Sequence, residues 1–210
     1  MKDKEDDSIK IILLGEASVG KTSLINVYES QTFDQNIKNT TNSSCIQKTV
    51  ETKEGKFSIK LWDTAGQEKY RAMNKIFIKN SSIVIFVYDI TRKKTFDELS
   101  FWFEYTQNTL GADESVYGIL ANKIDLFDKL EELKENNPEV EYKLVNTSDG
   151  SAYAKQIGAF FCETSAKEMA PGFSEFIQKL LEEYSLRNKT FNNRKSLKLD
   201  NLHRGGRCCK

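Results

Sequence analysis

Four short runs of apolar residues are spaced along the chain, and each predicts a buried β-strand. They are Ile9–Leu14, Ser82–Asp89, Val116–Asn122 and Ala159–Thr164. Because these runs are nearly continuous rather than alternating, they are typical of parallel strands with both faces covered. Apolar residues at helical spacing follow three of the runs and predict helices over Lys21–Ser30, Thr95–Leu110 and Phe173–Leu186.

Two further runs, Cys45–Thr52 and Lys56–Trp62, flank a turn that contains Gly55 and predict a β-hairpin. The polar residues 31–44 show no period and predict an exposed loop. Strands that alternate with helices indicate an α/β fold: a six-stranded, mostly parallel sheet with one antiparallel edge strand and helices on both faces. In such a sheet ligands lie beyond the carboxyl ends of the strands, so we expect the functional residues there.

The segment Gly15-Glu-Ala-Ser-Val-Gly-Lys-Thr22 lies between the first strand and the first helix and matches the phosphate-binding pattern Gly-x4-Gly-Lys-[Ser/Thr]. Glycines let the backbone direct its N–H groups toward phosphate oxygens, and the following helix adds a partial positive charge. Lys21 is expected to reach the β- and γ-phosphates, and the Thr22 hydroxyl to bind Mg²⁺. A tight turn with no ligand is the alternative, but such a turn does not require lysine and threonine side by side.

Charge is distributed unevenly, although the whole chain of 210 residues is neutral. From Arg187 onward eight basic residues accompany one acid, which makes this segment +7 and the remainder −7. Because charged residues make up 30% of the chain and hydrophobic residues 39%, we expect a compact domain with disordered ends. A basic, disordered tail over 188–210 favours an anionic surface as its partner.

The N-terminal arm, residues 1–8, is expected to be flexible and is too polar for a signal peptide. No run of apolar residues approaches the length of about 18 that spans a membrane. Cys45 and Cys162 fall within predicted strands, where we expect small buried side chains rather than a disulfide. Cys208 and Cys209 are adjacent, which makes them poor partners for a mutual disulfide.

Four segments, in this order, resemble the small GTPases of the Ras superfamily: Gly15–Thr22, Asp63–Gln67, Asn122–Asp125 and Glu163–Lys167. The resemblance covers roughly residues 8–186. Trp62–Arg71, Tyr88–Thr91 and the adjacent cysteines are similar to the Rab branch in particular. The resemblance implies a P-loop small G-domain over 9–187 that binds GTP or GDP with Mg²⁺ and hydrolyses GTP.

The resemblance also implies a role for each residue of a guanine-nucleotide site. Asp125 would accept hydrogen bonds from the guanine N1 and exocyclic amine, which selects GTP over ATP because adenine would leave a buried carboxylate unpaired. Asn122 would join this loop to the phosphate loop, and the Ala166 N–H would meet the guanine O6. The expected nucleotide contacts are Gly15, Glu16, Ala17, Ser18, Val19, Gly20, Lys21, Thr22, Ser23, Phe33, Thr40, Asp63, Gly66, Asn122, Lys123, Asp125, Ser165, Ala166 and Lys167.

For hydrolysis, the resemblance implies catalytic roles for Gln67, Lys21 and Gly66. It also implies Mg²⁺ binding by Thr22 and Thr40 and, through a water, by Asp63. Gly66 would turn its N–H to the γ-phosphate, and Gln67 would orient the attacking water. No arginine lies in or beside the phosphate loop along the sequence, nor in residues 31–62. We therefore expect slow unaided hydrolysis, with an arginine supplied by an activating protein.

Two features depart from the family pattern. The family places an aromatic residue and a metal-binding threonine at fixed distances after the phosphate-loop lysine, here Phe33 and Thr40; Thr41 is adjacent, fits the register of the hairpin glycine instead, and remains a second candidate. The second departure is an insertion at about 127–145, in which a short helix is expected before Pro138. That insertion is either a solvated surface segment or a docking element.

The sequence Arg-Cys-Cys-Lys at 207–210 is not a CaaX box, but it looks like a Rab-type ending with geranylgeranyl groups on Cys208 and Cys209. Two lipid chains anchor a protein stably where one does not. The resemblance thus implies a molecular switch in intracellular vesicle trafficking. Its expected place is the cytoplasmic face of an intracellular membrane, either an endomembrane or the plasma membrane, in exchange with the cytosol.

The implied partners are a guanine-nucleotide exchange factor, a GTPase-activating protein, a GDP-dissociation inhibitor, a Rab escort protein and effectors that bind the two switch regions. We expect a monomer that does not bind nucleic acid. Two other functions fit part of the sequence. A GTP-loaded scaffold without hydrolysis is permitted by the unusual residues 41–44 but opposed by Gln67, and an ATP-dependent kinase or ATPase is opposed by Asp125 and Ala166.

Overall fold

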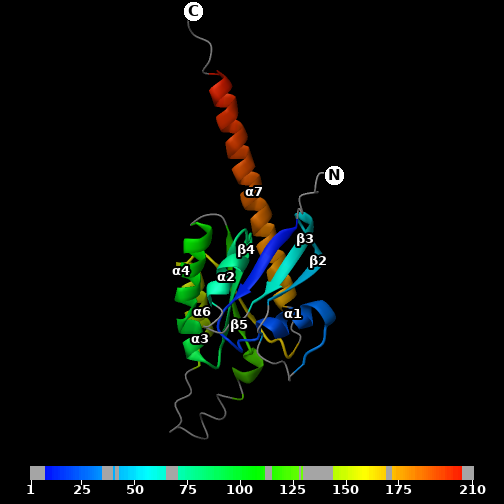
Figure 1. Ribbon diagram of the computed structural model, residues 1–210, viewed down its shortest axis with the longest axis vertical. Coiled ribbons are helices and arrows are strands. Elements are labelled where there is room, and N and C mark those ends of the chain that lie inside the picture. Colours follow the sequence, from blue (N-terminus) through cyan, green and yellow to red (C-terminus); the bar gives the residue numbers. More distant parts are fainter. Residues whose placement is uncertain are drawn as a thin grey trace, which may run out of the picture.

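The computed structural model describes residues 8–34, 40, 43–64, 71–111, 115–127, 129, 144–168 and 172–204, with the backbone alone for 71–74 and 191–204. Its elements are β1 (Ile9–Leu14), α1 (Lys21–Ser30), β2 (Ser44–Thr52), β3 (Gly55–Asp63), α2 (Arg71–Ile78), β4 (Ile83–Asp89), α3 (Lys93–Asp97), α4 (Leu99–Leu110), β5 (Val116–Asn122), the 3₁₀ turn η2 (Ile124–Leu126), α6 (Thr147–Gln156), β6 (Phe160–Thr164) and α7 (Gly172–Arg204). Helices surround a central sheet, and α7 runs well beyond it (Figure 1).

The sheet has the strand order β2-β3-β1-β4-β5-β6. β2 pairs antiparallel with β3, from Ser44 opposite Asp63 to Thr52 opposite Gly55, and the other pairs are parallel. The predicted six-stranded, mostly parallel sheet with one antiparallel edge strand is therefore confirmed. In this order, β1, β4 and β5 lie side by side, so that their carboxyl ends form one continuous rim.

Each inner strand contributes to two apolar cores, because successive side chains point to opposite faces of the sheet. Ile11 and Leu13 of β1 pack in one core with residues of α1 and α7. Ile12 and Leu14 pack in the other core with Trp102 of α4 and with residues of α2 and α6. Burial on both faces accounts for the nearly continuous apolar runs in the sequence, and it holds the strand ends in fixed positions.

The final helix is longer than predicted. The expectation that it ends near Leu186 is wrong, because α7 continues to Arg204. The disorder expected for the tail over 188–210 stays a prediction. No glycine or proline lies between Leu186 and Arg204, so nothing in the sequence stops the helix. Lys189 also forms an ion pair with Glu54 at the β2–β3 turn (2.5 Å), which joins the first turn beyond Leu186 to the body.

Two smaller expectations are also wrong. Cys45 is exposed, because β2 is an edge strand whose residues are mostly solvent-accessible. The helix predicted over Thr95–Leu110 is divided into α3 and α4 and begins at Lys93. Thr95 lies inside α3, where its hydroxyl accepts a hydrogen bond from the Asp89 N–H (3.0 Å) and donates one to the Arg92 carbonyl (2.8 Å). The helix α6 was not anticipated.

Most of the expected insertion at 127–145 lies outside the described residues. Among the helices of the described ranges, none combines the length and the apolar character needed to cross a membrane.

Candidate nucleotide site

The phosphate loop connects β1 to α1, and its two outer glycines lie against neighbouring strands. Gly15 has a φ of 146°, and a Cβ there would stand 2.2 Å from the Val87 carbonyl oxygen of β4. Gly20 has a φ of 99°, and a Cβ there would stand 2.3 Å from Nδ2 of Asn122, at the end of β5. Both positions require glycine for conformation and for space, so the loop is fixed closely against the carboxyl ends of two strands.

Lys21 is the first residue of α1, and its side chain turns back over the loop. Its ammonium donates hydrogen bonds to the carbonyls of Gly15 (2.8 Å) and Glu16 (2.9 Å). Burial lowers the pKa of Lys21 to about 8, against the opposing attraction of Asp63 and Glu16. A phosphate group in the loop would supply the negative charge that favours the ammonium form, so the position of Lys21 suits the predicted role.

Three predicted magnesium ligands, from α1, the segment before β2 and the end of β3, converge on one point. The Thr22 hydroxyl donates to Oδ2 of Asp63 (2.7 Å), and its oxygen lies 2.5 Å from the Thr40 hydroxyl oxygen. Because Thr22 has one hydroxyl proton and gives it to Asp63, Thr40 is the donor of the second bond. The structure thus brings Thr40 to the site, whereas Thr41 lies outside the described residues.

The Asp63 carboxylate is incompletely satisfied by the described residues. Its Oδ1 is buried and has no hydrogen-bond partner among them. Burial raises the pKa of Asp63, although the Thr22 hydroxyl and the Lys21 charge oppose this shift. A buried carboxylate oxygen beside two hydroxyls is a set of hard oxygen ligands, the kind that Mg²⁺ prefers. The residues therefore fit a magnesium ion.

Asn122 links three loops from its position at the end of β5, where its side chain is fully buried. Its Nδ2 donates to the Val19 carbonyl of the phosphate loop (2.8 Å), and its Oδ1 accepts from the Ala166 N–H (3.2 Å). Nearby, the Ser165 hydroxyl donates to Oδ1 of Asp125 (2.6 Å). The segments expected to bind guanine are thus joined both to one another and to the phosphate loop.

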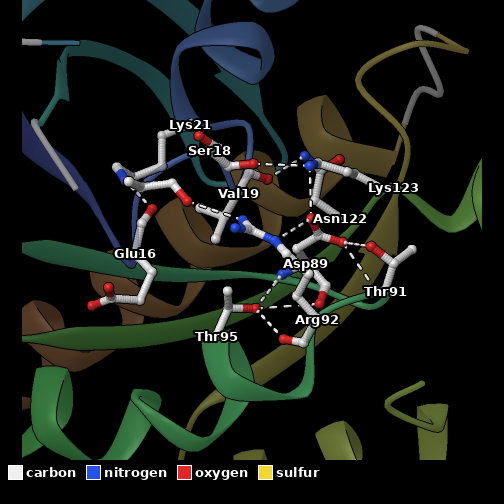
Figure 2. A network of polar contacts seen from close by, with 11 residues as sticks. Glu16, Ser18, Val19, Lys21, Asp89, Thr91, Arg92, Thr95, Asn122 and Lys123 are labelled. Carbon is white, nitrogen blue, oxygen red and sulfur yellow. Dashed lines mark hydrogen bonds and ion pairs between the residues drawn. The ribbon is translucent and has the colours of Figure 1, made fainter. Parts of the chain in front are cut away.

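Asp89, at the end of β4, forms the centre of a charged network shown in Figure 2. Its Oδ2 accepts hydrogen bonds from Nζ of Lys123 (2.6 Å) and Nε of Arg92 (3.0 Å), while Oδ1 accepts from the N–H and hydroxyl of Thr91 (3.0 and 2.6 Å). Burial alone would raise the pKa of Asp89, but the hydrogen bonds from Lys123 and Thr91 and the charge of Lys123 hold the pKa below its usual range. The buried carboxylate is therefore ionised and fully partnered.

Arg92 lies beside the phosphate loop in the fold, although no arginine lies near that loop in the sequence. Its Nη2 donates to the Ala17 carbonyl (2.9 Å), although 75 positions separate the two residues in the sequence. Neither residue was assigned to the site: Asp89 lies in the Rab-like segment Tyr88–Thr91, which implied no nucleotide contact, and Arg92 lies just beyond that segment. One signal could have found them: Asp89 directly follows an apolar strand, and polar residues at such strand ends converge on the ligand site.

The remaining expected residues lie around this centre. The Trp102 indole N–H of α4 donates to Oε1 of Glu16 (3.2 Å), a contact that no pattern indicated. Phe33 is partly buried against the core formed with α1 and α7, and Lys167 is exposed beside Ala166. Gly66, Gln67, Cys208 and Cys209 lie outside the described residues, so their roles stay predictions.

The fold and the converging loops define a P-loop G-domain. The sequence profile of the Ras family matches residues 10–185, and the chain belongs to this family of small GTPases, whose members hydrolyse GTP. The GTP-binding protein YPT52 of Saccharomyces cerevisiae is 29% identical over 188 residues, which cover 82% of this chain and 80% of that protein. GTP hydrolysis is therefore the activity of the chain, in place of the alternatives of an ATP-dependent kinase and a non-hydrolysing scaffold.

Proposed function

We propose that the chain is a Rab-type switch that alternates between GTP- and GDP-bound forms on the cytoplasmic face of an intracellular membrane and acts in vesicle trafficking. The Rab assignment is supported by the stretch Trp62–Arg71, by Tyr88–Thr91 and by the Cys208-Cys209 pair. The switch assignment is supported by GTP hydrolysis and by the place of two expected site residues. Thr40, an expected Mg²⁺ ligand, lies in the segment between α1 and β2, and Gly66, expected to contact the γ-phosphate, lies in the segment between β3 and α2.

The main observation in support of the nucleotide site is the convergence of Thr22, Thr40 and Asp63 beside the phosphate loop. In the proposed site these three residues hold Mg²⁺, which when bound neutralises charge on the β- and γ-phosphates. Thr40 and Asp63 come from the two segments that differ between the GTP and GDP forms of such switches, so their contact with Thr22 is the physical link between nucleotide state and surface shape.

Hydrolysis in the proposed mechanism depends on positioning by Lys21, the Gly66 N–H and Gln67. Lys21 holds the terminal phosphates by its charge, and Gln67 orients the attacking water. Arg92 is bonded to Asp89 and to the outer carbonyl of Ala17, so it does not replace an arginine from an activating protein. We therefore keep the proposal of slow unaided turnover, with an increase on the order of 10³–10⁵ from that partner.

Membrane attachment is proposed through geranylgeranyl groups on Cys208 and Cys209, assisted by the basic residues from Arg187 onward. The escort protein, the dissociation inhibitor, the exchange factor and the effectors of this cycle are proposed with it. Because α7 is helical to Arg204, its 18 residues from Arg187 would extend about 27 Å. A helix rather than an irregular segment would therefore separate the G-domain from the bilayer.

Two measurements test this function. The full chain, loaded with a fluorescent GDP analogue, should release it more than about tenfold faster when EDTA removes Mg²⁺, and guanine but not adenine nucleotides should compete. Failure of guanine nucleotides to bind would overturn the nucleotide site. Separately, mass spectrometry of the chain from eukaryotic cells should find two prenyl groups, and an unmodified pair of cysteines would overturn the Rab-type anchor.

A further inference from the structure

Three consecutive carbonyls of the phosphate loop are each held by a different side chain from a neighbouring strand end. The Ala17 carbonyl accepts from Nη2 of Arg92 (2.9 Å), the Ser18 carbonyl from Nζ of Lys123 (2.8 Å) and the Val19 carbonyl from Nδ2 of Asn122 (2.8 Å). Figure 2 shows Arg92, Asn122 and Lys123 approaching the loop from the Asp89 side.

These contacts determine where the N–H groups of the loop point. In a planar trans peptide the N–H lies antiparallel to the preceding carbonyl. A donor that fixes the carbonyl of residue 17, 18 or 19 therefore also fixes the N–H of residue 18, 19 or 20, on the opposite side of the loop. Those N–H groups are the ones expected to surround the phosphates.

Asn122 and Lys123 belong to the expected guanine loop, but Arg92 belongs to no motif. Hydrogen bonds within the chain nevertheless fix the position of Arg92. Its backbone N–H donates to the Asp89 carbonyl (3.0 Å), and its own carbonyl accepts from the Thr95 hydroxyl (2.8 Å). Its Nε shares Oδ2 of Asp89 with Lys123. One buried carboxylate thus orients two cations toward adjacent carbonyls of the loop.

We propose that Arg92 is a positioning residue that clamps the outer side of the phosphate loop and so strengthens the binding of the β-phosphate. This inference rests on the guanine-nucleotide site proposed above. The Arg92 guanidinium holds the Ala17 carbonyl, Asp89 holds the guanidinium, and the Ser18 N–H is thereby aimed into the loop. Arg92 itself need not touch the nucleotide, which distinguishes this role from that of a catalytic arginine.

If Arg92 clamps the loop, its loss should affect the binding of two nucleotides differently, which a general loss of stability would not do. GMP has the guanine, ribose and α-phosphate of GDP but no β-phosphate, so it depends far less on the N–H groups of residues 18–20. Loss of Arg92 should weaken GDP binding and spare GMP binding. A variant that simply loosens the fold should weaken both nucleotides together.

The experiment measures the ratio of GDP affinity to GMP affinity for the full chain in Mg²⁺, with GDP binding followed through association and dissociation rates. Arg92→Ala should reduce this ratio about tenfold, chiefly through faster GDP release, since it removes a charge-assisted hydrogen bond. Lys93→Ala is the matched control: it removes an equal charge from the next position, where Lys93 pairs with Asp97 on the surface of α3, and the ratio should stay parental.

Arg92→Lys separates charge from geometry, because lysine keeps the charge but cannot bond Asp89 and Ala17 through two nitrogens of one planar group. We expect an intermediate ratio. A parental ratio in Arg92→Lys would assign the effect to charge alone and overturn the clamp. An unchanged ratio in Arg92→Ala, or an equal loss of GDP and GMP binding, would also overturn it. Failure of the parent protein to bind GDP would instead refute the nucleotide site itself.

Discussion

Asn122→Ala is the substitution whose effect can be derived most directly from the structure. It removes a buried side chain that donates to the Val19 carbonyl (2.8 Å) and accepts from the Ala166 N–H (3.2 Å). Both partners are themselves buried, so each is left without the hydrogen bond that it makes here. An unsatisfied buried polar group costs about 1–3 kcal/mol, and two such groups predict a loss of about 3 kcal/mol in the free energy of unfolding.

The same loss of about 3 kcal/mol weakens the loops that hold the nucleotide. The Asn122→Ala protein should therefore release GDP about 100-fold faster than the parent protein. The measurement combines urea unfolding with the release of a fluorescent GDP analogue. Leu180→Ala is the control, because it creates a cavity of similar cost, about 2–5 kcal/mol, in the core beneath α7 and away from the loops. If Asn122→Ala released GDP no faster than Leu180→Ala, the proposed bridge between guanine loop and phosphate loop would be wrong.

Three further substitutions probe the site. Gly20→Ala should weaken GDP binding by about tenfold or more because its Cβ would meet Asn122 at 2.3 Å, whereas Gly111→Ala, with a similar positive φ but nothing within 4 Å, should cost stability alone. Asp63→Asn should abolish most of the acceleration of GDP release by EDTA, since an amide binds Mg²⁺ more weakly than a carboxylate; full acceleration in the variant would exclude Asp63 as a ligand. Burial lowers the pKa of Lys21 from 10.5 to about 8 in the folded protein, so the unfolded chain binds this proton more tightly. The free energy of unfolding of the nucleotide-free protein should therefore increase by up to about 3 kcal/mol between about pH 8 and pH 10.5. The Lys21→Met protein should lack this increase.

The parts of the fold that the sequence predicts well are those whose burial is complete. The runs at β1, β4 and β5 are apolar at nearly every position because both faces are covered, so the pattern leaves no ambiguity. Edge and surface elements are harder. Cys45 could belong to either face of β2, and only the position of that strand at the sheet edge decides that it is exposed.

The continuation of α7 was missed for a different reason. The composition of residues 188–204 is polar and basic, which favours disorder, while the absence of glycine and proline favours a helix. These two signals conflict, and the ion pair of Lys189 with Glu54 depends on the tertiary fold. The pairing of Arg92 with Ala17 likewise cannot be derived from spacing, because it requires β4 to lie beside β1.

The position of the charged network follows from the register of the sheet. β4 and β5 pair in parallel so that Asp89 lies opposite Asn122, and the Ile90 N–H donates to the Asn122 carbonyl just beyond the last pair (3.2 Å). Two adjacent strands therefore place Asp89 beside the Asn122-Lys123 pair at the carboxyl edge of the sheet. Since both strands are buried on both faces, neither end can shift without disturbing a core. The phosphate loop is thus held from outside by the ends of two fully buried strands. The free energy that orders its N–H groups is therefore supplied when the sheet folds rather than when nucleotide binds.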